Sequence, residues 1–219
     1  MVPPDAALLA PGTYLDSDHP AVIAFAEKAI GDATTDAEKA SRLFRAVRER
    51  LYYDPYTLSR DPHAHTASGA LELTRTYCIP KAVLLAAAAR AVGLPAQLGF
   101  SDVKNHLSSK KLIERLGTDL FAWHGYAEVW VDGIPYKLTP AFNASLCERF
   151  GVLPLDFDPA APADALLQPF NGEGQPYMEY VNDRGRFLDL PFAEILKAFD
   201  RIYPNVERAE PTHDEAFHD

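Results

Sequence analysis

The sequence has little cysteine, an excess of acidic over basic side chains and no long apolar run. Its two cysteines, Cys78 and Cys147, do not form a disulfide framework, and so few thiols in 219 residues are typical of a reduced, intracellular protein. Residues 1–18 lack the basic and apolar regions of a signal peptide. No run approaches the roughly 20 apolar residues that cross a bilayer. We therefore expect a cytoplasmic protein without membrane contact.

The charge balance also limits the partners. Acidic residues number 31 and basic residues 21, which gives a net charge of −10. A protein that binds nucleic acid or an anionic membrane needs a basic stripe for the phosphates, and none is present. Hydrophobic residues make up 47%, an ordinary value for a globular chain with a sizeable core.

Three helices are predicted in the first 92 residues, over about 17–31, 35–51 and 79–92. In the second, Thr35 and Glu38 have the spacing of a capping box. The third contains "AVLLAAAARAVG", which is apolar on every side. That pattern is typical of a buried central helix.

The second half of the chain is predicted to contain an antiparallel sheet. Two strands within "LFAWHGYAEVWVDGIPYKLTPAF" are joined by Asp132-Gly133, a dipeptide that favours a tight hairpin. The other predicted elements are strands at about 94–103 and 177–181, helices at 105–117 and near 192–201, and a loop over 52–69. Helices followed by a mostly antiparallel sheet indicate an α+β fold.

The chain shows no internal repeat and no clear linker between domains. We predict an irregular N-terminal segment at 1–16 and a core over 17–150. A proline- and glycine-rich extension over 151–204 is expected to pack on that core, and 205–219 form an acidic, flexible tail.

Cys78 lies at the start of the predicted central helix, in "TYCIPKAVLL". The positive end of the helix dipole and free backbone N–H groups favour a thiolate there, so we expect a lowered pKa and a nucleophile. His124 follows 46 residues later on a predicted strand and has the chemistry of a general base. Either residue alone could equally be a buried structural side chain.

Together these segments resemble the transglutaminase-like superfamily. The resemblance rests on a cysteine that opens a helix, on "RAVGLPAQLGF" after it, on the aromatic-His-x-aromatic-x-Glu strand and on the "VDG" turn, and it spans roughly residues 18–142. The regions "DVKNHLSSKKLIERLGTDLF" and "TPAFNASLCERFGVLPLDFD" look like a bacterial subgroup of that superfamily. The resemblance implies a papain-like fold with a Cys-His-Asp triad, in which Cys78 and His124 are the first two members.

The third member departs from the pattern. In the family an aspartate before a proline follows the histidine by about fifteen residues, and here Thr139 stands there, followed by Pro140. A threonine hydroxyl can accept a hydrogen bond from the imidazole but carries no charge. Asn143 is the alternative third member, and Asp102 and Asp158 are more distant ones.

Further candidate residues surround this pair. The backbone N–H of Cys78 is expected to bind a tetrahedral oxyanion, with Tyr77 or Tyr53 as a second donor. Asn105 and His106 could line the cleft. The alternative interpretation of these two is a turn in which Asn105 caps the next helix.

We therefore predict a cysteine acyl-transfer enzyme, a hydrolase or an acyltransferase, with a peptide, protein or small amide as substrate. The proposed chemistry of Cys78 and His124 requires no metal and no organic cofactor. His63 and His65 stand without the further ligands of a zinc site, so a solvated loop is the better interpretation of that pair. Two alternatives stay open: an inactive transglutaminase-like module that binds a peptide or protein partner, and a redox-sensing cysteine. The sequence leaves the oligomeric state open.

Overall fold

The computed structural model describes residues 6–106, 108–163, 178–203 and 205. The seven helices in this part are α1 (Pro20–Ile30), α2 (Asp36–Arg50), α3 (Ala67–Glu72), α4 (Cys78–Ala91), α5 (Lys110–Leu116), α6 (Ala144–Phe150) and α7 (Phe192–Ile202). Two short 3₁₀ helices, η1 (Ala6–Leu8) and η2 (His63–His65), accompany them. Within the described residues no helix is long and apolar enough to cross a membrane.

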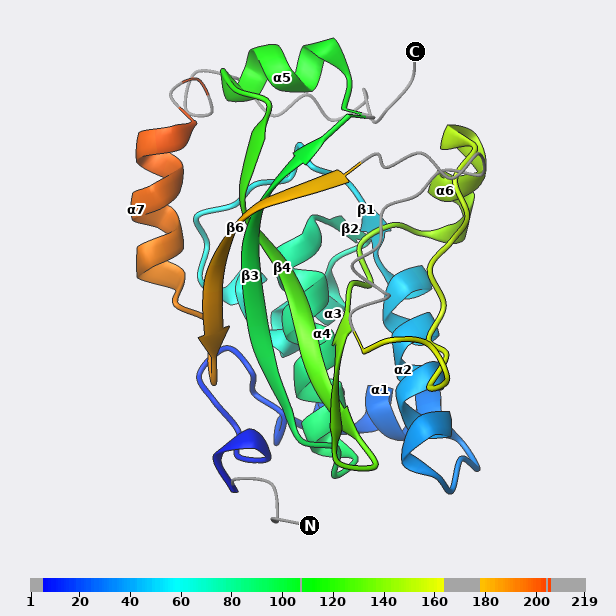
Figure 1. The fold of residues 1–219 in the computed structure, drawn as a ribbon. Helices are drawn as coiled ribbons and strands as arrows, with labels where there is room; N and C mark the ends of the chain where they lie inside the picture. Colours follow the sequence, from blue (N-terminus) through cyan, green and yellow to red (C-terminus); the bar gives the residue numbers. More distant parts are fainter. Residues whose placement is uncertain (1–5, 107, 164–177, 204, 206–219) are drawn as a thin grey trace.

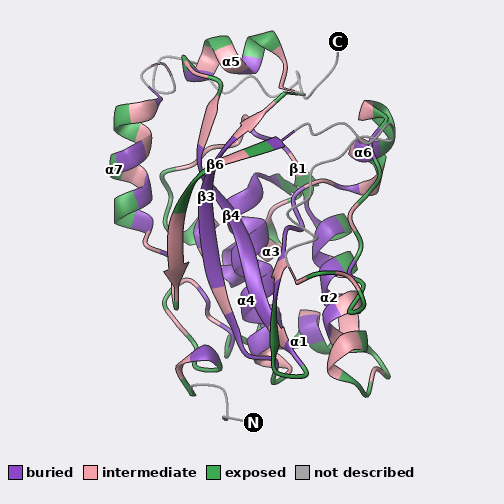
Figure 2. Cartoon of the chain, in the orientation of Figure 1, coloured by how far each residue is buried: buried purple, intermediate pink, exposed green. Residues whose placement is uncertain are grey.

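Helix α4 is the central element (Figures 1 and 2). It packs against the sheet on one side and against α1, α2 and α3 on the others. Every residue from Cys78 to Arg90 is buried, as the all-round apolar sequence predicts. Two of the buried residues are charged, and each donates hydrogen bonds to backbone carbonyls: Lys81 to Arg48 and Leu51, and Arg90 to Ala10, Ala96 and Leu188.

The sheet is antiparallel with the order β5-β4-β3-β6. Its strands are β3 (Ala96–Asn105), β4 (Leu120–Val131), β5 (Ile134–Leu138) and β6 (Met178–Phe187). Asp132 and Gly133 form the predicted hairpin turn, with φ angles of 52° and 82° that a tight two-residue turn requires. The α+β prediction is confirmed, and β6 is a full strand rather than the short one expected.

The predicted capping box is also confirmed: Thr35 Oγ1 accepts from the Glu38 N–H, while the Glu38 carboxylate accepts from the Thr35 N–H. The stretch over 52–69 is more ordered than predicted. It contains η2 and the start of α3, and β1 (Tyr52–Tyr53) pairs in parallel with β2 (Arg75–Thr76). Helix α3 packs four small buried residues against its surroundings, so tertiary contact rather than intrinsic propensity explains it.

Candidate active site

Cys78 is the first residue of α4 and is almost fully buried. Burial raises the pKa of its thiol to about 11, although the backbone N–H groups of Gly125, Cys78 and Ile79 act in the opposite direction. The predicted fall in pKa is therefore wrong for the protein as the structure describes it. The helix N-terminus does favour the thiolate, but the cost of removing a charge from water is larger.

Gly125 lets strand β4 approach the first turn of α4. A Cβ atom at this position would lie 3.1 Å from Phe100 Cε1 and 3.4 Å from Ile79 Cα, both tight contacts. Without a side chain, the N–H of residue 125 comes close enough to Cys78 to lower the pKa of its thiol. A glycine is therefore needed after His124 because a side chain at position 125 would hold strand β4 away from Cys78.

His124 lies on β4 with only 4% of its surface exposed. Burial lowers the pKa of its imidazole to about 4, so the ring is neutral at pH 7 and able to accept a proton. Its Nε2 is buried and has no hydrogen-bond partner within the described part of the chain. The ring of Tyr180 lies beside the imidazole, with centroids 6.3 Å apart.

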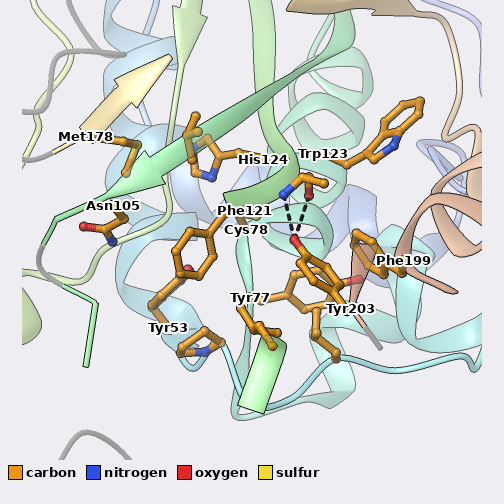
Figure 3. A pocket seen from close by; sticks show the side chains of 15 residues that line it. Tyr53, Tyr77, Cys78, Asn105, Phe121, Trp123, His124, Met178, Phe199 and Tyr203 are labelled. Carbon is orange, nitrogen blue, oxygen red and sulfur yellow. Dashed lines mark hydrogen bonds between the residues drawn. The ribbon is translucent and has the colours of Figure 1, made fainter. Parts of the chain in front are cut away.

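Cys78 and His124 line one pocket (Figure 3). The pocket encloses about 520 Å³ of empty space, counting the part open to solvent. Most of its lining is aromatic or aliphatic, and no charged side chain contributes to it among the residues described. The other lining residues are Tyr53, Pro55, Leu58, Tyr77, Val103, Asn105, Leu116, Phe121, Ala122, Trp123, Met178, Phe199 and Tyr203.

Thr139 stands where the family's aspartate is expected, and it is buried. Its hydroxyl, like Nε2 of His124, has no hydrogen-bond partner among the residues that the structure describes. These two atoms are two of only four buried side-chain nitrogen and oxygen atoms without a partner in that part of the chain.

Two other candidates for the third member, Asn143 and Asp158, make their hydrogen bonds to groups other than the imidazole of His124. Asn143 Oδ1 accepts from the Tyr53 N–H at 2.7 Å, and its Nδ2 donates to the carbonyls of Arg48 and Leu51. Asp158 is exposed in a turn and accepts from the Ala160 N–H. Neither is brought to the imidazole by a hydrogen bond.

Asp102 contacts the strand that carries His124 but not through the imidazole. Its carboxylate accepts from the backbone N–H of Trp123, from Arg184 and from Asn182. Burial raises the pKa of this carboxyl, but the hydrogen bonds from these three groups outweigh burial and hold it below the ordinary value.

The two candidate oxyanion donors differ in their hydroxyl groups. His65 Nδ1 bonds to the carbonyl of Asp61, which can only accept, so in the neutral ring Nδ1 carries the proton and Nε2 accepts. Tyr77 therefore donates its hydroxyl proton to His65 Nε2, 2.7 Å away, and has none left for an oxyanion. The Tyr53 hydroxyl has no partner within the described residues.

Asn105 lines the pocket from the end of β3, and His106 is exposed in the following turn. The interpretation of Asn105 as a helix cap is wrong, because Ser109 caps α5 and accepts from the Leu112 N–H. Cys147 is buried in α6 and packs with Val103, Val152 and Met178.

The two histidines of the 52–69 stretch have ordinary partners. His63 contacts Glu72 at 3.2 Å on the surface, and His65 bonds to Asp61 and Tyr77. Among the described residues no group of three metal-ligating side chains comes together.

Sequence reasoning missed the part of the pocket that comes from the C-terminal region. Tyr203 follows α7, accepts from the Ala122 N–H at 2.6 Å and donates to the Ala122 carbonyl, as the dashed lines in Figure 3 show. Phe199 and Met178 also reach the pocket. The apolar spacing of α7 indicates a buried face, but no local signal indicates what that face covers.

Comparisons with known proteins give the family. The family model of the transglutaminase-like superfamily matches residues 23–137. None of the curated proteins compared with the chain matches it.

Solved structures give more distant likenesses. A Cytophaga hutchinsonii protein, provisionally named a cysteine protease, is 16% identical with a TM-score of 0.47; the match covers 83% of this chain and 53% of that one. This chain thus spans about half of that protein. The arylamine N-acetyltransferase of Mycobacterium abscessus is 14% identical with a TM-score of 0.47, over 93% of this chain and 75% of that one. The family match covers more than half of the chain, which therefore belongs to the transglutaminase-like superfamily and has its papain-like α+β fold.

Proposed function

We propose that the protein is a cysteine acyl-transfer enzyme in which Cys78 is the nucleophile and His124 the general base. The observation that supports it most is that a cysteine at the first residue of α4 and a neutral, buried histidine on β4 line one pocket. The family of the chain supports a cysteine-based enzyme. We propose that the acyl group passes from Cys78 either to water, which is hydrolysis, or to an amine, which is transfer.

In the first step the sulfur of Cys78 attacks a carbonyl carbon while His124 takes the thiol proton. The C–S bond forms, and the carbonyl π electrons move to oxygen. With a thiol pKa of about 11 and an imidazole pKa of about 4, the neutral pair is the resting state at pH 7. The proton therefore moves during the attack rather than before it.

The tetrahedral oxyanion then needs hydrogen-bond donors. The backbone N–H of Cys78 is one, and the hydroxyl of Tyr53, which has no partner within the described residues, is the second. When the intermediate collapses, the bond to the leaving group breaks and His124 returns its proton to that group. Water or an amine, deprotonated by His124, later attacks the thioester and releases Cys78 as a thiol.

The pocket favours an uncharged acyl group. Its described lining is mostly aromatic and aliphatic, and a charged substituent would lose its hydration without gaining a counter-ion there. We therefore propose acyl donors with an apolar acyl part rather than acidic or basic side chains.

A second candidate function is a binding module that has lost its chemistry. It is favoured by Thr139, which supplies no carboxylate, and by the raised pKa of Cys78. Such a module would bind the same apolar groups in the pocket without forming a thioester.

The test uses p-nitrophenyl hexanoate as an apolar probe and the p-nitrophenyl ester of succinate as a charged one. We expect a burst of p-nitrophenol and an acyl adduct on Cys78 by mass spectrometry, with hexanoate faster by about tenfold or more. Cys78→Ala abolishes the adduct, His124→Ala slows it by about 10²–10⁴-fold, and Cys147→Ala leaves it unchanged. Unacylated Cys78 together with saturable binding of hexanoate would establish the binding module instead.

A further inference from the structure

The backbone just before His124 is strained. Trp123 has a φ of 59°, in the left-handed region that a bulky residue rarely adopts. Such a conformation costs about 1–3 kcal/mol and persists only where the surroundings enforce it. Because Trp123 and His124 are consecutive, the conformation of Trp123 sets the direction in which the imidazole leaves the strand.

The strain coincides with a bulge. Ser101 pairs with His124 and Val103 with Phe121, so Ala122 and Trp123 together face the single residue Asp102. A bulge breaks the alternation of side chains and re-aims those beside it, and bulges are frequent next to active sites. The one extra residue leaves backbone groups outside the regular ladder, and these need other partners.

Asp102 supplies the partner for Trp123. Its Oδ1 accepts from the Trp123 N–H at 3.0 Å, while Arg184 binds both carboxylate oxygens at 2.7–3.0 Å. The guanidinium of Arg184 also lies over the Trp123 indole, 5.2 Å from the ring centroid. One ion pair thus holds the backbone and the side chain of the same residue.

We propose that Asp102 and Arg184 are positioning residues for His124, which hold Trp123 in its left-handed conformation and so direct the imidazole toward the pocket. This rests on the proposed function of His124. It explains how the imidazole is oriented although its Nε2 has no side-chain partner within the described residues. The carboxylate acts through the strand rather than through the ring.

Strands β4 and β6 provide a control, a second set of arginine, acid and aromatic residue whose acid lies on β4 rather than on β3. Arg186 of β6 lies over the ring of Tyr126, 5.3 Å from its centroid, and pairs with Glu128 of β4 at 3.3 Å. This second set resembles the first, and Arg186 also pairs with Asp183 at 2.9 Å. Within the described residues Glu128 accepts hydrogen bonds only from the side chains of Gln97 and Arg186, and not from a strained peptide. Removing Arg186 therefore tests the loss of a similar ion pair while the contacts of Asp102 and Arg184 with Trp123 stay in place.

The first test compares Asp102→Ala, Asp102→Asn and Arg186→Met in the acylation assay. We expect Asp102→Ala to lower the acylation kcat by about 10²-fold with little change in KM, because a small displacement of a catalytic group has that effect. Asp102→Asn keeps an oxygen for the Trp123 N–H and should lose less than about tenfold. Equal rates for Asp102→Ala and Arg186→Met would overturn the proposal.

Two readouts are independent of activity. The Trp123 amide should exchange with solvent faster in Asp102→Ala than in Arg186→Met, and the NMR titration of His124 should shift only in the former. These readouts test the positioning even if the wild type forms no acyl-enzyme, which would refute the proposed function alone. Unchanged amide exchange and an unchanged titration would refute the positioning.

A glycine at position 123 keeps the proposal testable if Asp102→Ala folds poorly. Glycine adopts positive φ without strain, so the Asp102–Arg184 ion pair is no longer needed to hold the backbone of residue 123 in this conformation. In the Trp123→Gly background, changing Asp102 to Asn or Ala should therefore lower kcat by a smaller factor than in the wild type. The same factor in both backgrounds would mean that Asp102 does not act through Trp123.

Discussion

Two pairs of buried polar side chains, a first and a second cluster, differ in whether their hydrogen bonds are made within the described part of the chain. In the first, Lys81 and Asn143 donate to the carbonyls of Arg48 and Leu51 at the end of α2. In the second, the imidazole of His124 and the hydroxyl of Thr139 each keep a buried atom without a partner in the described part of the chain.

The difference in hydrogen bonding indicates a structural role for the first cluster and a functional role for the second. A fully bonded cluster stabilises the fold. Burial lowers the pKa of the Lys81 amine to about 7, so its hydrogen bonds rather than a full positive charge hold it at the end of α2. An unbonded buried polar atom costs free energy, so natural proteins keep one chiefly where it serves a task. The first cluster joins α4 to α2. In the second, His124 lines the candidate active site, while Thr139 follows strand β5.

The largest effect is expected in the first cluster. Asn143→Ala removes three hydrogen bonds and leaves the Tyr53 N–H without its acceptor, so we expect the free energy of unfolding to fall by about 3 kcal/mol. Urea denaturation measures it. Lys81→Met is the control and should cost less, because Asn143 still bonds both carbonyls. A loss under about 1 kcal/mol for Asn143→Ala would mean that water replaces the amide.

The second cluster should appear in the pH dependence of stability. The pKa of His124 is about 4 in the folded protein and about 6.5 when unfolded, so the unfolded state takes up the proton first. Stability is complete above pH 6.5 and is lost as the pH falls toward 4. Between these values the wild type should lose about 3 kcal/mol more than His124→Gln, whose side chain does not titrate. Denaturation curves at pH 7 and pH 4 measure the difference. Parallel losses in both proteins would show that His124 is accessible to water.

Much of the fold could be predicted from local sequence. The all-round apolar run predicts the buried α4, Thr35 and Glu38 predict a helix start, and Asp132-Gly133 predicts a hairpin. These signals are local, because each depends on the conformational preference of a few neighbouring residues. The choice of Cys78 and His124 depended on their chemistry and on the resemblance of the flanking segments to the transglutaminase-like superfamily.

What could not be predicted depends on contacts between distant segments. Burial by segments that are distant in the sequence raises the pKa of Cys78, and this effect outweighs the backbone N–H groups at the start of its own helix, which lower it. Tyr203 reaches Ala122 across 81 positions, and Arg184 reaches Asp102 across 82. No pattern of neighbours encodes such pairings, and the strained conformation of Trp123 follows from them.

The smallest effect should come from Thr139→Val, which replaces the hydroxyl by a methyl group of similar size. The hydroxyl has no hydrogen-bond partner among the described residues, so its removal relieves a desolvation cost, and the protein should gain up to about 1 kcal/mol of stability. Thermal and urea unfolding measure this, with Thr76→Val, at another buried threonine, as the matched control. A loss of more than about 1 kcal/mol would instead show that Thr139 makes a hydrogen bond in solution. Such a bond would make Thr139 part of a bonded cluster like that of Asn143, and the contrast between the two clusters would then rest on His124 alone.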